Sequence, residues 1–101
     1  MGIRENKVEK YLSDEVTKIG GVTRKWVSPG QDGVPDRIVI VKTNSPVWLV
    51  EVKTIDGKLS TPQIREHHRL VQAGAKVTTV YGYGGVDKFI FFLKQELKYE
   101  T

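Results

Sequence analysis

The chain has 101 residues, of which 39% are hydrophobic, and its 16 basic and 12 acidic side chains give a formal net charge of +4. This length predicts one domain over residues 1–101 with a modest hydrophobic core. The chain has no cysteine and two histidines, His67 and His68, which excludes disulfides, thiolate metal sites and structural zinc sites of the Cys/His type. Any metal site must therefore use oxygen ligands, and these favour Mg²⁺ or Mn²⁺.

Charge and hydropathy also limit where the protein acts. The N-terminus has no apolar run of signal-peptide length, and no segment approaches the length of a membrane span. We therefore expect a cytoplasmic protein with no membrane partner. The pI of about 9.4 favours a polyanionic partner such as nucleic acid, but only weakly when taken alone.

Apolar spacing and turn residues divide the chain into seven elements. Apolar residues at helical spacing follow the N-terminus, and Gly20–Gly21 end this predicted helix. Residues 59–62 open a second helix, with Pro62 in its first turn and Ser60 or Thr61 as its N-cap. The predicted elements are helix 3–19, strand 22–27, strand 36–41, strand 47–53, helix 59–73, strand 76–81 and helix 86–97.

This α-β-β-β-α-β-α order predicts an α/β fold with a mixed central sheet flanked by helices on both sides. A turn at Thr43–Pro46 joins the second and third strands, and a turn at Gly82–Gly85 precedes the last helix. A helix between the third and fourth strands implies that those two strands are parallel. The inward side of the last helix is expected to carry Phe89, Ile90, Phe92 and Leu93.

Two acidic residues mark the predicted hairpin. Asp36 begins one strand, and Glu51 lies in the next with Lys53 two positions further on. Strand side chains alternate, so Glu51 and Lys53 point to one face. Pairing of the strands would bring Asp36 close to Glu51. Two carboxylates that hold a metal ion, with an ammonium group beside them, suit phosphodiester hydrolysis, and the carbonyl of Val52 is a further candidate ligand.

These residues carry a resemblance to a known family. Pro35-Asp36 followed by Glu51-Val52-Lys53 resembles the PD-(D/E)xK pattern of the restriction-endonuclease-like nucleases. Residues 5–93 more specifically resemble the VRR-NUC domain in its compact stand-alone form from phages and prophages. The motifs that carry this resemblance are Glu5 and Glu9, Gly20–Gly21, Lys25–Trp26, Gly33–Arg37, Val50–Lys53 and Leu59–Gln63.

The resemblance implies a metal-dependent DNA nuclease with a restriction-endonuclease-like core that uses Mg²⁺ or Mn²⁺. Stand-alone members resemble Holliday-junction resolvases, which implies branched DNA as the partner and a homodimer. Symmetric cutting of a junction requires two sites related by a two-fold axis. Within a phage-infected or prophage-bearing bacterial cell, such a protein would be cytoplasmic.

The resemblance also implies roles for further residues. A glutamate from the first helix often completes the metal site, and Glu5 and Glu9 are the candidates. On a helical wheel Glu5 lies about 40° from the centre of the apolar stripe and Glu9 about 80°, which slightly favours Glu5. Gln63, in the first turn of the second helix, would support Lys53, the attacking water or a phosphate oxygen.

Simpler interpretations stay open for each residue. Asp36 is also typical of a turn residue that pairs with Arg37, and Glu51 and Lys53 of an ion pair on a solvated face. His67 and His68 are expected at the helix surface or rim. The rival functions are a non-catalytic DNA-binding module, a small interaction protein with a structural cation, and a nuclease that acts on flaps or duplex ends.

Overall fold

The computed structural model describes residues 4–42 and 46–98. Its elements follow the predicted α-β-β-β-α-β-α order, so the predicted fold class is confirmed. Ile3 of the predicted first helix and residues 43–45 of the predicted turn lie outside the described residues. The elements are α1 (Glu5–Lys18), β1 (Val22–Lys25), β2 (Arg37–Ile40), β3 (Trp48–Lys53), α2 (Thr61–Gln72), β4 (Lys76–Tyr81) and α3 (Gly82–Lys98).

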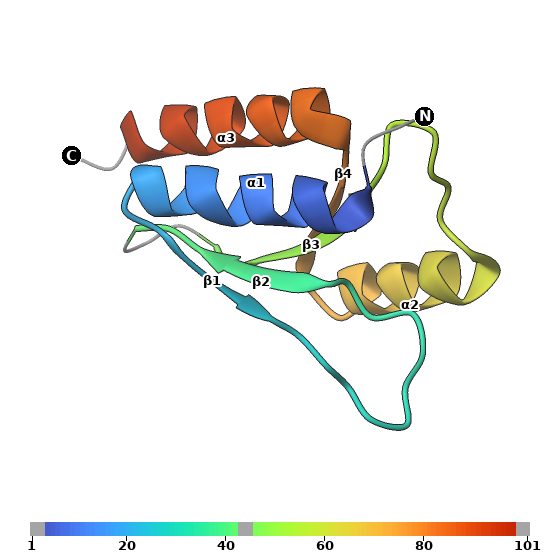
Figure 1. Ribbon diagram of the computed structural model, residues 1–101. Helices are drawn as coiled ribbons and strands as arrows, with labels where there is room; N and C mark the ends of the chain where they lie inside the picture. The colour runs from blue at the N-terminus through green and yellow to red at the C-terminus, as the bar shows by residue number, and fades with distance from the viewer. Residues whose placement is uncertain (1–3, 43–45, 99–101) are drawn as a thin grey trace.

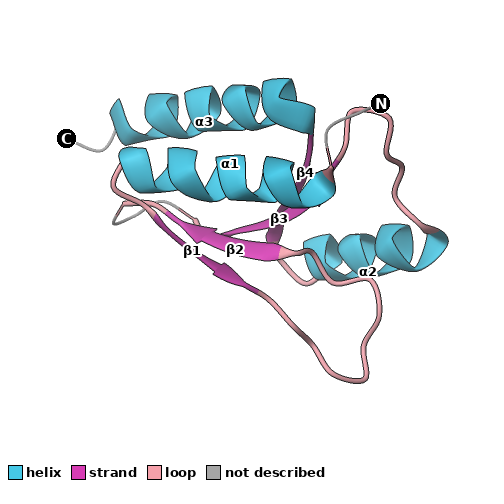
Figure 2. Ribbon diagram, viewed as in Figure 1, coloured by secondary structure: helices cyan, strands magenta, loops and turns pink. Residues whose placement is uncertain are grey.

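The four strands form one mixed sheet in the order β1-β2-β3-β4. The first three strands are antiparallel neighbours, and β4 runs parallel to β3 after the crossover through α2. Helices α1 and α3 lie side by side over one face of the sheet, and α2 lies on the other side (Figures 1 and 2). Arg37 pairs with Val50, which places Asp36 next to Glu51 at one end of the β2–β3 pair.

The hydrophobic core lies between the sheet and the α1–α3 layer. Val50 and Val52 are completely buried on that face of β3, as the alternation of strand side chains requires. The opposite face of β3 therefore presents Glu51 and Lys53 toward α2. The buried apolar residues are Val8, Leu12, Val16, Val39, Val41, Val50, Val52, Val80, Val86, Phe89, Ile90 and Leu93.

The start of the last helix differs from the prediction. Residues 82–85, predicted as a turn, form the first turn of α3, which follows β4 without a connecting loop. Gly82 adopts φ +64°, and a Cβ at Gly85 would lie 3.2 Å from the backbone carbon of Val80. Such an abrupt change from strand to helix needs residues without side chains. The glycines here therefore form the first turn of the helix and not a separate turn before it.

The prediction for Phe92 is wrong. It is 40% exposed, because the inward stripe of α3 runs through Phe89, Ile90 and Leu93 and leaves Phe92 on its flank. Its ring lies nearly perpendicular to that of Trp48, with the ring centroids 5.6 Å apart. Trp48 itself packs against the core.

Smaller differences concern the ends of elements. β1 ends at Lys25 and not at residue 27, and Val27 is 70% exposed. α2 begins after its N-cap Ser60, and Ala73 is its C-cap. Among the helices within the described residues, none is long and apolar enough to cross a membrane.

Gly33 fixes the loop that leads into β2. It adopts φ +87°, and a Cβ there would overlap the carbonyl group of Pro62 and lie 3.0 Å from the backbone nitrogen of Gln63. The loop therefore packs directly on the start of α2. Gly30 has a similar φ of +82°, but a Cβ on Gly30 would meet no atom within 4 Å, which makes it a matched control.

We predict that Gly33→Ala destabilises the protein clearly more than Gly30→Ala. Both variants place an alanine in left-handed backbone, which costs about 1–2 kcal/mol, and only Gly33→Ala adds a steric overlap, worth about 1–3 kcal/mol more. Urea unfolding followed by circular dichroism measures the difference. Equal midpoints for the two variants would contradict the close packing of Gly33 on α2.

Candidate active site

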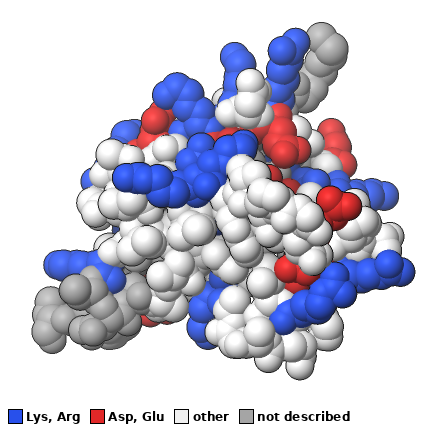
Figure 3. Space-filling model, turned by 90° about the horizontal axis from the view of Figure 1, so that it is seen from below, with Lys and Arg blue, Asp and Glu red and all other residues white. Residues whose placement is uncertain are grey.

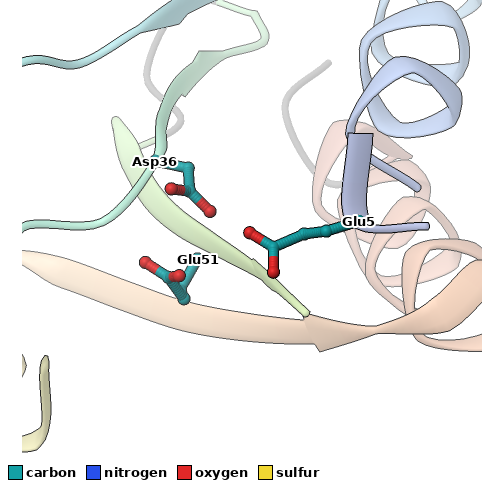
Figure 4. A group of neighbouring side chains, drawn as sticks. All are labelled: Glu5, Asp36 and Glu51. Atoms are coloured by element: carbon teal, nitrogen blue, oxygen red, sulfur yellow. The ribbon is translucent and has the colours of Figure 1, made fainter. Parts of the chain in front are cut away.

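Three carboxylates from separate elements converge at one end of the β2–β3 pair. Glu5 comes from the first turn of α1, Asp36 from the residue before β2, and Glu51 from the middle of β3. One oxygen atom from each lies within 4.8 Å of the others. Figure 4 shows the three side chains pointing toward a common space. Such a group of hard oxygen donors suits a divalent cation.

Asp36 is held in place by both neighbouring strands. Its Oδ2 accepts a hydrogen bond of 2.9 Å from the backbone N–H of Val52, and its carbonyl accepts one of 2.9 Å from the N–H of Trp26. In an antiparallel pair the N–H and C=O of one residue point to the same side of the strand. The Val52 carbonyl, predicted as a metal ligand, therefore points to the same side as the N–H that binds Asp36.

Glu51 is the most constrained of the three carboxylates, with only 1% of the residue exposed. Its Oε2 accepts a hydrogen bond of 3.0 Å from Gln63 Nε2 and lies 3.7 Å from Lys53 Nζ. Its Oε1 is buried without a hydrogen-bond partner among the described residues. Burial, and then the charge and hydrogen bond of Asp36, raise the pKa of Glu51 to about 8, although Lys53 opposes the shift.

Gln63 is oriented by the start of α2. Its Oε1 accepts a hydrogen bond of 2.8 Å from the N–H of Ser60, and its own N–H donates to Ser60 Oγ at 3.3 Å. This reciprocal pair is a capping box. Because the amide oxygen is held by Ser60, the amide NH₂ group is the end that faces Glu51. The cap of the helix thus positions a side chain of the site.

The two glutamates of α1 have different surroundings. Glu5 belongs to the carboxylate group. Glu9 does not, because its Oε2 accepts a hydrogen bond of 2.8 Å from Arg37 Nε and lies 3.5 Å from Lys25 Nζ. Arg37 follows Asp36 directly but pairs with Glu9 and not with Asp36, since consecutive residues of a strand point to opposite faces.

The prediction that His67 lies at the helix surface or rim is wrong. It is only 8% exposed, and its Nε2 lies 3.9 Å from Glu51 Oε1. Burial lowers the pKa of His67, although the backbone of Gly33 opposes the shift. His67 lies four residues after Gln63, and that spacing places both on one side of α2; the exposed neighbour is His68.

Comparison with known proteins found relatives of this chain. The chain is 48% identical over 75 residues, 74% of its length and 80% of the relative, to "Putative nuclease p44" of Acyrthosiphon pisum secondary endosymbiont phage 1. It is also similar to a solved structure described as a VRR_NUC domain, with 35% identity and a TM-score of 0.76 over 85% of this chain and 92% of that one.

A third protein shares the fold at lower identity. It is Hjc, a Holliday junction resolvase of Archaeoglobus fulgidus, with 18% identity and a TM-score of 0.56 over 76% of this chain and 67% of that chain. No family model matches the chain. The fold, together with the two closer similarities over most of the lengths compared, nevertheless confirms the resemblance carried by the sequence motifs, and the chain belongs to the VRR-NUC domain family of nucleases.

Proposed function

We propose that this protein is a divalent-metal-dependent endonuclease that hydrolyses phosphodiester bonds in branched DNA. The observation that carries the proposal is the convergence of Glu5, Asp36 and Glu51 within 4.8 Å, with Lys53 beside Glu51. Membership of a nuclease family supports the hydrolysis of phosphodiester bonds.

The residues of the site fit Mg²⁺ or Mn²⁺. All three side chains offer carboxylate oxygens, the buried Glu51 Oε1 has no other partner among the described residues, and the Val52 carbonyl points to the same side. The raised pKa of Glu51 indicates that its negative charge is under-compensated by the protein. When bound there, a divalent cation would activate a water and offset the charge that develops on the phosphate.

Lys53 and Gln63 would complete the site. The side chain of Lys53 is 13% exposed and lies on the same face as Glu51, so its ammonium group can stabilise an anionic phosphate oxygen or orient the attacking water. Gln63, held by the capping box, keeps the Glu51 carboxylate fixed through its hydrogen bond to Oε2.

Charge and shape support DNA as the partner. The net charge is +4, and Lys and Arg side chains stand along much of the outline of the face shown in Figure 3. Phosphate contacts of this kind position nucleic acid without reading its sequence. The similarity in fold to a Holliday junction resolvase supports a branched substrate, and the phage relative supports action in the cytoplasm of an infected or prophage-bearing bacterial cell.

The proposal includes a homodimer, because symmetric cleavage of a junction needs two sites. The free edge of the sheet at β4 supports it. Beside that edge, a hollow of about 600 Å³ is lined largely by apolar side chains, among them Trp48, Tyr81 and Phe92. We propose a second copy of the chain as the occupant of this hollow.

Cleavage of labelled DNA tests the function directly. With Mg²⁺ or Mn²⁺, we expect paired symmetric nicks in a four-way junction and much slower cleavage of a flap or linear duplex. We predict that Asp36→Ala, Glu51→Ala and Lys53→Ala each lower the rate at least about 100-fold. Lys10→Ala is the control, since Lys10 is exposed and pairs with Asp14.

Light scattering on the same samples measures the oligomeric state, and circular dichroism confirms folding. Equal cleavage of all three substrates would contradict junction specificity. Full activity of a folded Asp36→Ala or Lys53→Ala variant would contradict the assigned site.

The choice between the two glutamates of α1 is testable by calorimetry. We predict that Glu5→Gln weakens Mn²⁺ binding, because it replaces one of the three negatively charged carboxylates by a neutral amide. Glu9→Gln should leave the Mn²⁺ affinity within about twofold, a change of about 0.4 kcal/mol. Glu9→Gln should instead lower stability modestly through loss of the Arg37 pair. The opposite pattern of affinities would make Glu9 the helix carboxylate.

The raised pKa of Glu51 predicts an unusual pH dependence of stability in EDTA. The unfolded chain releases the Glu51 proton near pH 4.5 and the folded protein near pH 8. Stability should therefore fall as pH rises between these values, by up to about 1.4 kcal/mol per pH unit. The charged groups that set this shift are Asp36, Lys53 and Glu5.

Urea unfolding from pH 5 to pH 8.5, compared with Glu51→Gln, isolates this contribution. His67, whose pKa is lowered, contributes in the opposite direction below pH 6.5 in both proteins, so the difference between the two curves reports Glu51. Parallel curves for the two proteins would contradict the raised pKa.

A further inference from the structure

A small apolar hollow lies at the end of the molecule where α1 and α3 both begin (Figure 1). It has a volume of about 250 Å³ and is lined by Val8, Ile55, Gly82, Tyr83 and Gly84. Two of its walls are large side chains that stand in solvent, since Ile55 is 67% exposed and Tyr83 is 38% exposed. Single exposed apolar residues are ordinary, but a group of them around one hollow marks an interaction site.

The hollow adjoins the carboxylate group through two short segments of the chain. On α1, Val8 lies three residues after Glu5, which is about one turn of the helix. After β3, Ile55 follows Lys53 by two residues, and Lys53 Nζ lies 3.7 Å from Glu51 Oε2. A DNA strand with a phosphate at the carboxylate group would therefore pass close to the hollow.

The ring of Tyr83 is supported by the neighbouring helix. Tyr11 of α1 packs against it, with the ring centroids 4.8 Å apart and the ring planes inclined by 53°. The hydroxyl of Tyr11 donates a hydrogen bond of 2.6 Å to Asp87 on α3, which ties the two helices together at this point. A tyrosine has few rotatable bonds and offers a large rigid surface at a low cost in conformational entropy. Tyr83 is therefore preorganised as a wall of the hollow.

The walls of the hollow and the charges around it suit a flat, uncharged group carried on a polyanion. Among the described residues, no charged side chain lines the hollow. Cationic groups lie outside it, because Lys53 stands beside the carboxylate group and the exposed Lys7 lines an adjoining hollow together with Tyr11 and Tyr83. Proteins that bind unpaired nucleic acid combine an aromatic ring for the base with basic side chains for the phosphates. The same combination is present here.

We propose that the hollow receives one unpaired base of the DNA, which stacks on Tyr83 and packs against Ile55 beside the strand held at the carboxylate group. This inference rests on the proposed function and deepens it, because it names the feature of branched DNA that the protein recognises. A base inside an intact duplex must be unpaired and unstacked before it can enter, whereas a base that is already unpaired enters at a lower cost. Since every base has a flat face, this contact selects DNA structure and not sequence.

Affinity for two matched DNAs tests the inference. One is a duplex with a single unpaired base, the other is the fully paired duplex of the same sequence, and both are measured with Ca²⁺ in place of Mg²⁺ to avoid cleavage. We expect Tyr83→Leu to weaken binding of the first DNA about 5- to 100-fold and binding of the second less than about twofold. Tyr83→Phe keeps the ring and should bind like the unaltered protein, and Ile55→Ala should show a smaller loss for the first DNA. The matched control is Phe91→Leu, which removes a 63% exposed ring of α3 outside the hollow and should change neither affinity.

Photochemical cross-linking adds a direct readout of the contact. With iodouracil at the unpaired position, irradiation should join the base to the ring on which it stacks, and mass spectrometry should locate the link at Tyr83. No link at Tyr83, an unchanged preference for the unpaired base in a folded Tyr83→Leu variant, or an equal loss of affinity for both DNAs would overturn the inference. Metal-dependent cleavage of junctions alongside such results would leave the proposed function standing. An unaltered protein that neither binds nor cleaves any of these DNAs would overturn both.

Discussion

The burial of one carboxylate, Glu51, is the constraint on which the rest of the site depends. A carboxylate in the middle of a sheet is costly unless partners compensate for its lost hydration. In this protein the compensation is incomplete, because Gln63 and Lys53 both approach Oε2 and leave Oε1 without a partner among the described residues. The fold thus maintains a strong, partly unsatisfied acceptor at a fixed position, which is what cation binding requires.

The groups around Glu51 are positioned by local structural features that also stabilise the fold. The capping box that begins α2 fixes the amide of Gln63, and the close packing of Gly33 on Pro62 fixes the loop before Asp36. In each case a local backbone requirement and a functional requirement are met by the same residue. Changes at Ser60 or Gly33 would consequently affect the site even though neither residue belongs to the carboxylate group.

Local periodicity made the placement of Glu51, Lys53 and Asp36 predictable from the sequence, whereas the roles of Glu5 and Gln63 were implied by the family resemblance. Strand alternation placed Glu51 and Lys53 on one face, and the hairpin placed Asp36 at the same end. His67 could not be predicted in this way, because nothing in its own helix shows that the polar side of α2 is covered by the sheet. The prediction for Phe92 failed for a similar reason, because the width of the buried stripe on α3 is set by how α1 packs beside it.

The pairing of Glu9 with Arg37 explains how the site keeps its negative charge. Arg37 is adjacent to Asp36 in sequence and would neutralise the site if it turned toward it. Strand alternation points it away, and Glu9 holds it there at 2.8 Å. Among the described residues, the three carboxylates are then balanced by one nearby ammonium group, that of Lys53, because the lowered pKa of His67 favours a neutral imidazole. Full ionisation would leave two uncompensated negative charges, which matches the charge of one divalent cation.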